Sequence, residues 1–340
     1  MQAVREYGRA YERAPSATEK PIPAQLPSAS SQASDTDGPY QAHVADIVAR
    51  GDFAQLENEA QQARKSKARL RGGDWKLFGF YDGVTNPLTG KHASNSDWQT
   101  LLASIKKWVT AYPDSATARV ALAGTYINYA WAARGTGYSD TVSESSWILF
   151  RQLVELGKST LLDAARLNEK CPYWYDVMQV VALSQGWEEQ QARELLNAAT
   201  AFEPTYYRFY RNYALFSLPK WYGGEGATQA FAEEVYTRLG GRDGSIVYFE
   251  IASLLACQLD RKRDSLVGMS WPRVKQGYAN LDRLYSMSNL KMNRFGYMSF
   301  LVGDKSVARE VFAELGTSWN GLVWHSASEF ESARAWALTP

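Results

Sequence analysis

The sequence contains few of the residues that form metal centres and disulfides. Its 340 residues include only two cysteines, Cys171 and Cys257, and three histidines. The cysteines lie far apart and neither belongs to a CxxC pair, so local spacing gives no Cys/His zinc pattern. Two buried free thiols and a single disulfide both stay open as interpretations. The sequence therefore predicts no metal and no other cofactor.

Long apolar runs and an excess of one charge are also missing. No apolar stretch approaches the roughly 20 residues that a membrane-spanning helix needs. The chain has 37 basic and 36 acidic residues, a net charge of +1. Such a balance argues against a dominant nucleic-acid surface. We therefore expect neither a membrane span nor a nucleic-acid partner.

The beginning of the chain does not have the pattern of a signal peptide, because Met1–Lys20 is charged and has no apolar core. Residues 1–37 are expected to be a disordered leader, since their prolines lack an amide donor and their Ala and Ser side chains bury little surface. The compartment stays open. The absent signal favours the cytoplasm, whereas a Pro/Ala/Ser-rich leader favours a periplasmic or secreted protein whose signal peptide has been removed.

Apolar residues are plentiful, at 45% of the chain, and they recur at helical spacing. Between Trp98 and Val109 they follow the i, i+3, i+4, i+7 pattern of one buried helix face. Paired amphipathic segments then repeat, and their turns contain Pro113, Pro172 and Pro204. The last two prolines are 32 residues apart, close to the tetratricopeptide period of about 34 residues.

This order of helix, proline turn and helix predicts an all-α fold. We expect an α-solenoid of antiparallel helix pairs, TPR-like, because one helical hairpin cannot bury its apolar face alone. A closed helical bundle is the rival architecture. One repeat domain is expected over residues 38–340, with a C-terminal capping helix at Trp319–Trp336. The Gly- and Pro-rich stretch near residues 71–97 is expected to be a long aromatic-rich loop with a short strand at Leu77–Tyr81.

Three segments resemble an uncharacterised bacterial family, the DUF4034 proteins. They are Asp46–Glu57, Arg134–Val142, and Leu218–Gly224 together with Phe231–Glu234. The resemblance spreads over most of residues 40–260. It implies a fold similar to that of tetratricopeptide proteins, and it implies no established activity and no catalytic residues.

A tyrosine-rich segment is the first candidate binding site. Tyr206, Tyr207 and Tyr210 lie on one expected helix together with Arg208 and Arg211. In a solenoid, one helix of each pair lines a concave surface. The segment therefore predicts a Tyr-rich surface that holds a partner by its ring faces, with the arginines pairing with carboxylates. The same spacing is equally typical of rings that pack between hairpins.

The glycine-rich turn after this segment is the second candidate. Trp221 and Tyr222 precede two glycines, and no Lys-Ser/Thr pair follows them, so the turn is not a P-loop. Our first hypothesis is a non-enzymatic protein–protein interaction or scaffold protein that binds a peptide or protein partner on the Tyr-rich surface. The alternative is an α-helical hydrolase-like or small-molecule- or glycan-binding protein that uses an aromatic pocket near Trp221. The sequence identifies no catalytic residue for either hypothesis.

Overall fold

The structure is a computed structural model that describes residues 38–88, 93–135, 139–258 and 263–339. The expected leader, residues 1–37, lies outside these ranges. Within them the fold is all-α, as predicted, and has no β-strand. The chain divides into two compact units, so the single repeat domain expected over residues 38–340 spans both.

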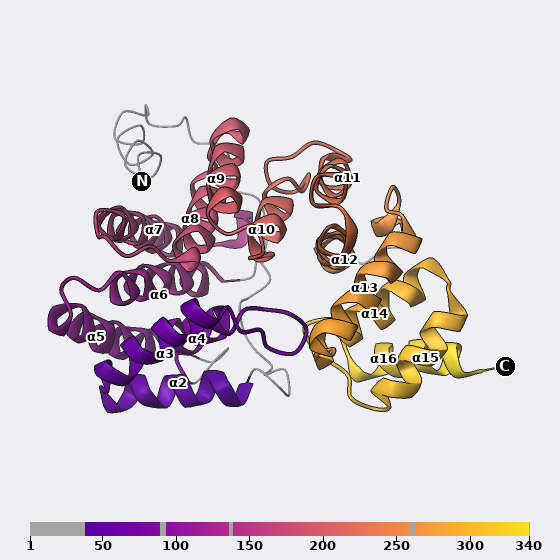
Figure 1. The fold of residues 1–340 in the computed structure, drawn as a ribbon, viewed down its shortest axis with the longest axis horizontal. Helices are drawn as coiled ribbons and strands as arrows, with labels where there is room; N and C mark the ends of the chain where they lie inside the picture. Colours follow the sequence, from indigo (N-terminus) through magenta and orange to yellow (C-terminus); the bar gives the residue numbers. More distant parts are fainter. Residues whose placement is uncertain (1–37, 89–92, 136–138, 259–262, 340) are drawn as a thin grey trace. The chain divides into compact units, whose positions relative to one another are not determined.

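The first unit comprises residues 39–68 and 75–223. Its helices pair along the chain, α5 with α6, α7 with α8, and α9 with α10. Neighbouring pairs meet in chain order, since α6 packs on α7 and α8 on α9, and also through their second helices, since α4 packs on α6, α6 on α8, and α8 on α10. We call α4, α6, α8 and α10 the even-numbered layer. Figure 1 shows this succession of helices in indigo to red. The elements of the first unit are α2 (Gly38–Arg50), α3 (Phe53–Ser66), α4 (Lys76–Thr85), α5 (Asn95–Ala111), α6 (Ala116–Arg134), η2 (Ser139–Thr141), α7 (Glu144–Ala165), α8 (Pro172–Gln185), α9 (Glu189–Phe202) and α10 (Arg208–Phe216).

The second unit comprises residues 69–74 and the chain from residue 224 onward. Here α12 packs on α11, α13 and α14, and α15 packs on α14 and α16. Its core includes the stacked rings of Tyr278 and Phe295, whose centroids are 3.8 Å apart. The elements are α11 (Ala227–Leu239), α12 (Gly241–Gln258), η3 (Arg263–Leu266), α13 (Trp271–Tyr285), α14 (Asn289–Val302), α15 (Lys305–Leu315) and α16 (Ala327–Leu338).

The proline turns lie where the sequence predicts them, between the two helices of a pair. Pro113 lies between α5 and α6, Pro204 lies between α9 and α10, and Pro172 is the first residue of α8. A proline suits the first position of a helix because the amide that it lacks would have no partner there. The side chain of Ser115 caps α6 by accepting from the backbone N–H of Ala118 at 3.0 Å. These local signals set where each pair turns.

The prediction of a loop near residues 71–97 is wrong at its centre, since Lys76–Thr85 forms α4. The short strand predicted at Leu77–Tyr81 is wrong for the same reason. Gly83 lies inside this helix, at a position where a Cβ would come within 2.6 Å of the backbone oxygen of Gln41. The glycine therefore permits close packing against α2 and does not mark a turn. The buried face follows the helical i, i+3, i+4, i+7 pattern, and it consists of Leu77, Phe80, Tyr81 and Val84.

The C-terminal helix expected at Trp319–Trp336 begins later than predicted. Ser326 caps α16 by accepting from the backbone N–H of Glu329 at 3.1 Å, so the helix starts at Ala327. The residues before it form turns, and within them the indole of Trp324 is buried and donates to Asn293 Oδ1 at 2.8 Å. The first part of the expected helix is therefore a turn segment packed against α14.

Candidate functional site

The even-numbered layer contains a buried carboxylate with three donors around it. Asp176, on α8, is 2% exposed. It accepts from Tyr206 Oη at 3.1 Å, Arg208 Nε at 2.8 Å and Asn212 Nδ2 at 2.5 Å. Arg208 and Asn212 are four residues apart on α10, so both side chains lie on the face that meets α8. We call these four residues the Asp176 cluster.

The tyrosines beside this carboxylate are kept in their neutral form. Burial raises the pKa of Tyr206 well above its ordinary value, and the charge of Asp176 raises it further. The pKa of Tyr173 is also raised, first by burial and then by the charges of Asp176 and Asp82. A neutral phenol is a hydrogen-bond donor. The Tyr206 hydroxyl therefore stabilises the carboxylate, and neither phenol is poised as a base.

A second polar group joins α4 to α6. Asn128 Nδ2 donates to Thr85 Oγ1 at 2.9 Å and to Asn86 Oδ1 at 3.3 Å. Asn86 in turn donates to Asp82 Oδ1 at 3.1 Å, and Gln41 Nε2 donates to Asp82 Oδ2 at 2.6 Å. These bonds fix the orientation of the Asn128 amide.

Two amide oxygens in the layer are left without a protein donor. Among the residues that the structure describes, the Oδ1 atoms of Asn128 and Asn212 accept no hydrogen bond, although each Nδ2 is fully engaged. Both side chains are half-buried. Neither oxygen is fully buried, so water can be its partner in the free protein and a ligand can take the place of that water. The two oxygens are therefore acceptors that the fold orients and does not itself use.

The three tyrosines of the first predicted site are buried in the first unit. Tyr206 and Tyr210 are each 1% exposed and Tyr207 is 8% exposed. The ring of Tyr206 meets that of Trp75 edge-on at 5.3 Å, and Tyr210 donates to the backbone oxygen of Pro204 at 3.1 Å. Their ring faces pack between helices, so the structure does not place them on an open surface.

The two predicted arginines lie on α10 and are both half-buried. The Arg208 guanidinium lies 3.5 Å from the centroid of the Phe78 ring while its Nε donates to Asp176. Its side chain is 24% exposed. The structure thus brings Tyr206 and Arg208 together at one carboxylate, and Arg211 lies next to Asn212 in the same helix.

The second predicted site is a packed turn. Trp221 is 5% exposed, and its ring meets Trp131 edge-on at 5.9 Å. Its indole N–H has no hydrogen-bond partner among the described residues. Tyr222 donates to the backbone oxygen of Leu183 at 3.0 Å. Both rings therefore join the turn after α10 to the helices beneath it.

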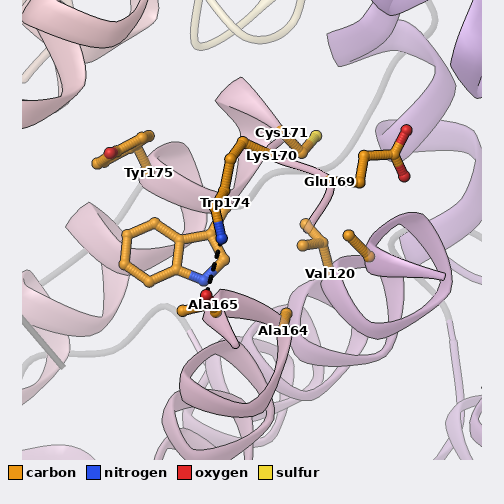
Figure 2. A pocket seen from close by; sticks show the side chains of 9 residues that line it. Val120, Ala164, Ala165, Glu169, Lys170, Cys171, Trp174 and Tyr175 are labelled. Carbon is orange, nitrogen blue, oxygen red and sulfur yellow. Dashed lines mark hydrogen bonds between the residues drawn. The ribbon is translucent and has the colours of Figure 1, made fainter. Parts of the chain in front are cut away.

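A small apolar hollow lies elsewhere in the first unit, among α6, α7 and α8 (Figure 2). It leaves about 20 Å³ for the centres of water molecules, which is the room of one or two waters. The Trp174 indole beside it donates to the backbone oxygen of Leu161 at 2.7 Å. No residue of either predicted site lines it, and a peptide or sugar ring does not fit it. The lining residues are Ala116, Val120, Ala164, Ala165, Glu169, Lys170, Cys171, Trp174 and Tyr175.

Both cysteines are free thiols, which decides between the two interpretations left open by the sequence. Cys171 is buried with its sulfur 3.3 Å from Tyr81 Oη, and Cys257 is half-buried on α12. Within the described ranges, no three His, Cys, Asp or Glu side chains come together as a metal site. Every helix in those ranges is too short or too polar to cross a bilayer.

Sequence reasoning missed Asp176, Asn212 and Asn128, although it named Tyr206 and Arg208 of the same cluster. One signal was available for Asp176: it is the only charged residue in Pro172–Gln185, a helix whose residues are otherwise apolar or neutral. A single carboxylate in such a helix requires donors from a neighbouring element. No comparable local signal marks Asn128, whose partners come from α4.

Two comparisons with known proteins, one against curated proteins and one against solved structures, gave no match. A family described as a domain of unknown function, DUF4034, matches residues 41–189. Of the segments that resemble this family in sequence, Asp46–Glu57 and Arg134–Val142 lie inside the match, whereas Leu218–Gly224 lies outside it. The region from α2 through α8, which carries Asn128 and Asp176, is therefore DUF4034-like.

Proposed function

We propose that the protein is a non-enzymatic interaction protein that binds an extended peptide segment of a partner along α6, α8 and α10. The observation that carries this proposal is the pair of oriented acceptors, the Oδ1 atoms of Asn128 and Asn212. They lie on α6 and α10, the two helices that flank α8 in the layer. The pairwise succession of helices also supports a solenoid-like array, in which one row of helices forms the binding face.

An extended peptide matches these acceptors in chemistry. Each of its residues except proline carries a backbone N–H that has no partner within the segment. Recognition through the backbone gives affinity without a fixed sequence. Since the amide nitrogens of Asn128 and Asn212 are already tied to neighbouring residues, little rotamer freedom is lost when their oxygens accept from a ligand.

The predicted site residues take new roles in this proposal. Tyr206 and Arg208 hold Asp176, which in turn holds Asn212 at 2.5 Å. Arg211 lies three residues after Arg208 on the same helix, and Asp176 balances the charge of Arg208. Tyr207 and Tyr210 are buried at the start of α10. A glycan or small-molecule pocket near Trp221 has less support, because that ring is buried against Trp131.

The test is selection of random dodecapeptides on the full chain, followed by affinity measurement on Asn128→Ala. We expect selected peptides to bind Asn128→Ala about tenfold more weakly than the parent, the effect of losing about 1.4 kcal/mol. Asn197→Ala, an exposed asparagine on α9, is the matched control and should bind like the parent. Selection that yields no peptide, or peptides that bind Asn128→Ala and the parent equally, would refute the proposal. Circular dichroism establishes that each variant is folded.

A further inference from the structure

Helix α3 contacts the first of three successive helix pairs near its own beginning. Glu57 Oε1 accepts from Trp108 Nε1 at 2.9 Å, and the ring of Phe53 stacks on that of Trp108 at 6.4 Å. Trp108 is in the last turn of α5. Glu57 also forms a hydrogen bond with Ser115, the N-cap of α6. The first half of α3 is therefore fixed to the turn between α5 and α6.

The second pair is reached from the last part of α3. Arg64 donates to Thr117 Oγ1, at the start of α6, at 2.7 Å. The same guanidinium pairs with Glu169, in the turn between α7 and α8, at 2.5 Å. The Arg64 side chain is only one-tenth exposed, so solvent screens this pair less than it screens an open surface pair. One side chain thus joins two neighbouring pairs.

The third pair is reached from the residues that follow α3. Lys67 Nζ pairs with Glu203 at 2.6 Å, and Glu203 also accepts from Thr205 Oγ1 at 2.9 Å. Trp75 Nε1 donates to the backbone oxygen of Thr205 at 3.3 Å. Residues 203–205 form the turn between α9 and α10. All these groups belong to the first unit.

The spacing along α3 matches the spacing of packed helices. From Glu57 to Arg64 the helix advances seven residues, about 10 Å at 1.5 Å per residue. Packed helices lie about 8–10 Å apart. In a repeat array each hairpin touches only its neighbours, so small changes in spacing accumulate along the array. An element that touches three turns in a row opposes that accumulation.

We propose that α3, with Lys67 and Trp75, is a clamp that fixes the spacing of the pairs α5–α6, α7–α8 and α9–α10. Arg64 and Lys67 are its positioning residues. The clamp acts in the free protein and gives the first unit one arrangement of its helix pairs before any ligand is present. This inference goes beyond the binding function and does not depend on it.

The clamp predicts that loosening one contact affects turns that the altered residue does not touch. The experiment is hydrogen exchange followed by mass spectrometry on the full chain without ligand. In Arg64→Met we expect amide exchange to rise about threefold or more at residues 112–118, 166–173 and 200–207, since local opening is limited by the contacts that hold an element. The last of these segments is diagnostic, because it meets Lys67 and Trp75 and has no contact with Arg64.

Two further variants keep the test decisive. Arg151→Met removes an exposed ion pair on α7, Arg151 with Glu144, and should leave all three turns unchanged. Lys67 is 57% exposed, so Lys67→Met folds even where Arg64→Met does not, and it should speed exchange at residues 112–118. If exchange rises only at the turn that each altered residue touches, or rises equally in Arg151→Met, the contacts are local and there is no clamp.

Discussion

Asp176→Asn should destabilise the first unit far more than the loss of an average surface charge. The substitution keeps the shape of the side chain and replaces one accepting oxygen with a donating NH2 group. Tyr206 and Arg208 donate to one oxygen of Asp176 and Asn212 donates to the other, so the new NH2 group would face either that pair or Asn212 where each now meets an acceptor. Hydrogen bonds to a charged group contribute about 1.5–3 kcal/mol each. They do not add fully here, since Arg208 is 24% exposed and can turn toward water.

The expected cost is therefore about 3 kcal/mol, between one strong bond and the full set. For a unit of roughly 150–250 residues, each kcal/mol lowers the melting temperature by about 2–4 °C, which gives a fall of about 6–12 °C. Differential scanning calorimetry of the full chain measures it. Asp163→Asn is the matched control, because Asp163 pairs with Arg166 at 3.0 Å on the surface of α7, and exposed pairs contribute less than about 1 kcal/mol. A fall in Asp176→Asn no larger than in this control would refute the reasoning.

Three other substitutions test separate parts of the structure. Lys291 Nζ lies 2.6 Å from the buried carboxylate of Glu250, so Lys291→Met leaves that carboxylate without a cation and should lower the free energy of unfolding by about 3–5 kcal/mol. Adding Glu250→Gln should restore part of this stability, which a double-mutant cycle of denaturation midpoints measures. Burial raises the pKa of Glu57 above its ordinary value, so the folded chain is relatively more stable while Glu57 is protonated, and this stability is lost as pH rises from the ordinary pKa through the raised one. Glu57→Gln, which can still accept from Trp108, should therefore stabilise the chain at about pH 7 and change little at about pH 4. Gly83→Ala should lower the melting temperature although alanine favours helices, because its Cβ would lie 2.6 Å from a backbone oxygen of α2; an unchanged melting temperature would contradict that close approach.

The helices with a regular apolar stripe could be predicted from the sequence, and α15 (Lys305–Leu315) is such a helix. Its signals are local: Asp304 caps the first turn by accepting from Val307 N–H at 3.3 Å, and the apolar period is that of a helix. The prediction failed at α4 because the contact that requires a glycine there comes from a different helix. Gly83 is required by the backbone of α2, and a sequence shows glycine without showing whether it serves a turn or a close contact.

The candidate site was less predictable for a related reason. Helical spacing of aromatic residues is the same whether the rings face a groove or a core, so the pattern at Tyr206 and Tyr210 did not reveal that both are buried. The contacts that define the Asp176 cluster join α8 to α10 across about 30 positions of the sequence. Spacing rules describe neighbours within one helix, so they do not describe such a pair of helices.

The Asp176 cluster and the two asparagines also have to be weighed against a purely structural role. A buried ionic network is weak evidence for stability, since apolar residues of similar volume often stabilise a fold equally well or better. A network that serves packing alone is expected to satisfy each of its members. Asp176 meets this expectation, with three donors. The Oδ1 atoms of Asn128 and Asn212 differ, because no described residue donates to them and both remain open to solvent. Acceptors that are held in place and unused serve a ligand better than they serve the core, which is why we place the binding face on α6, α8 and α10 and not on the tyrosines.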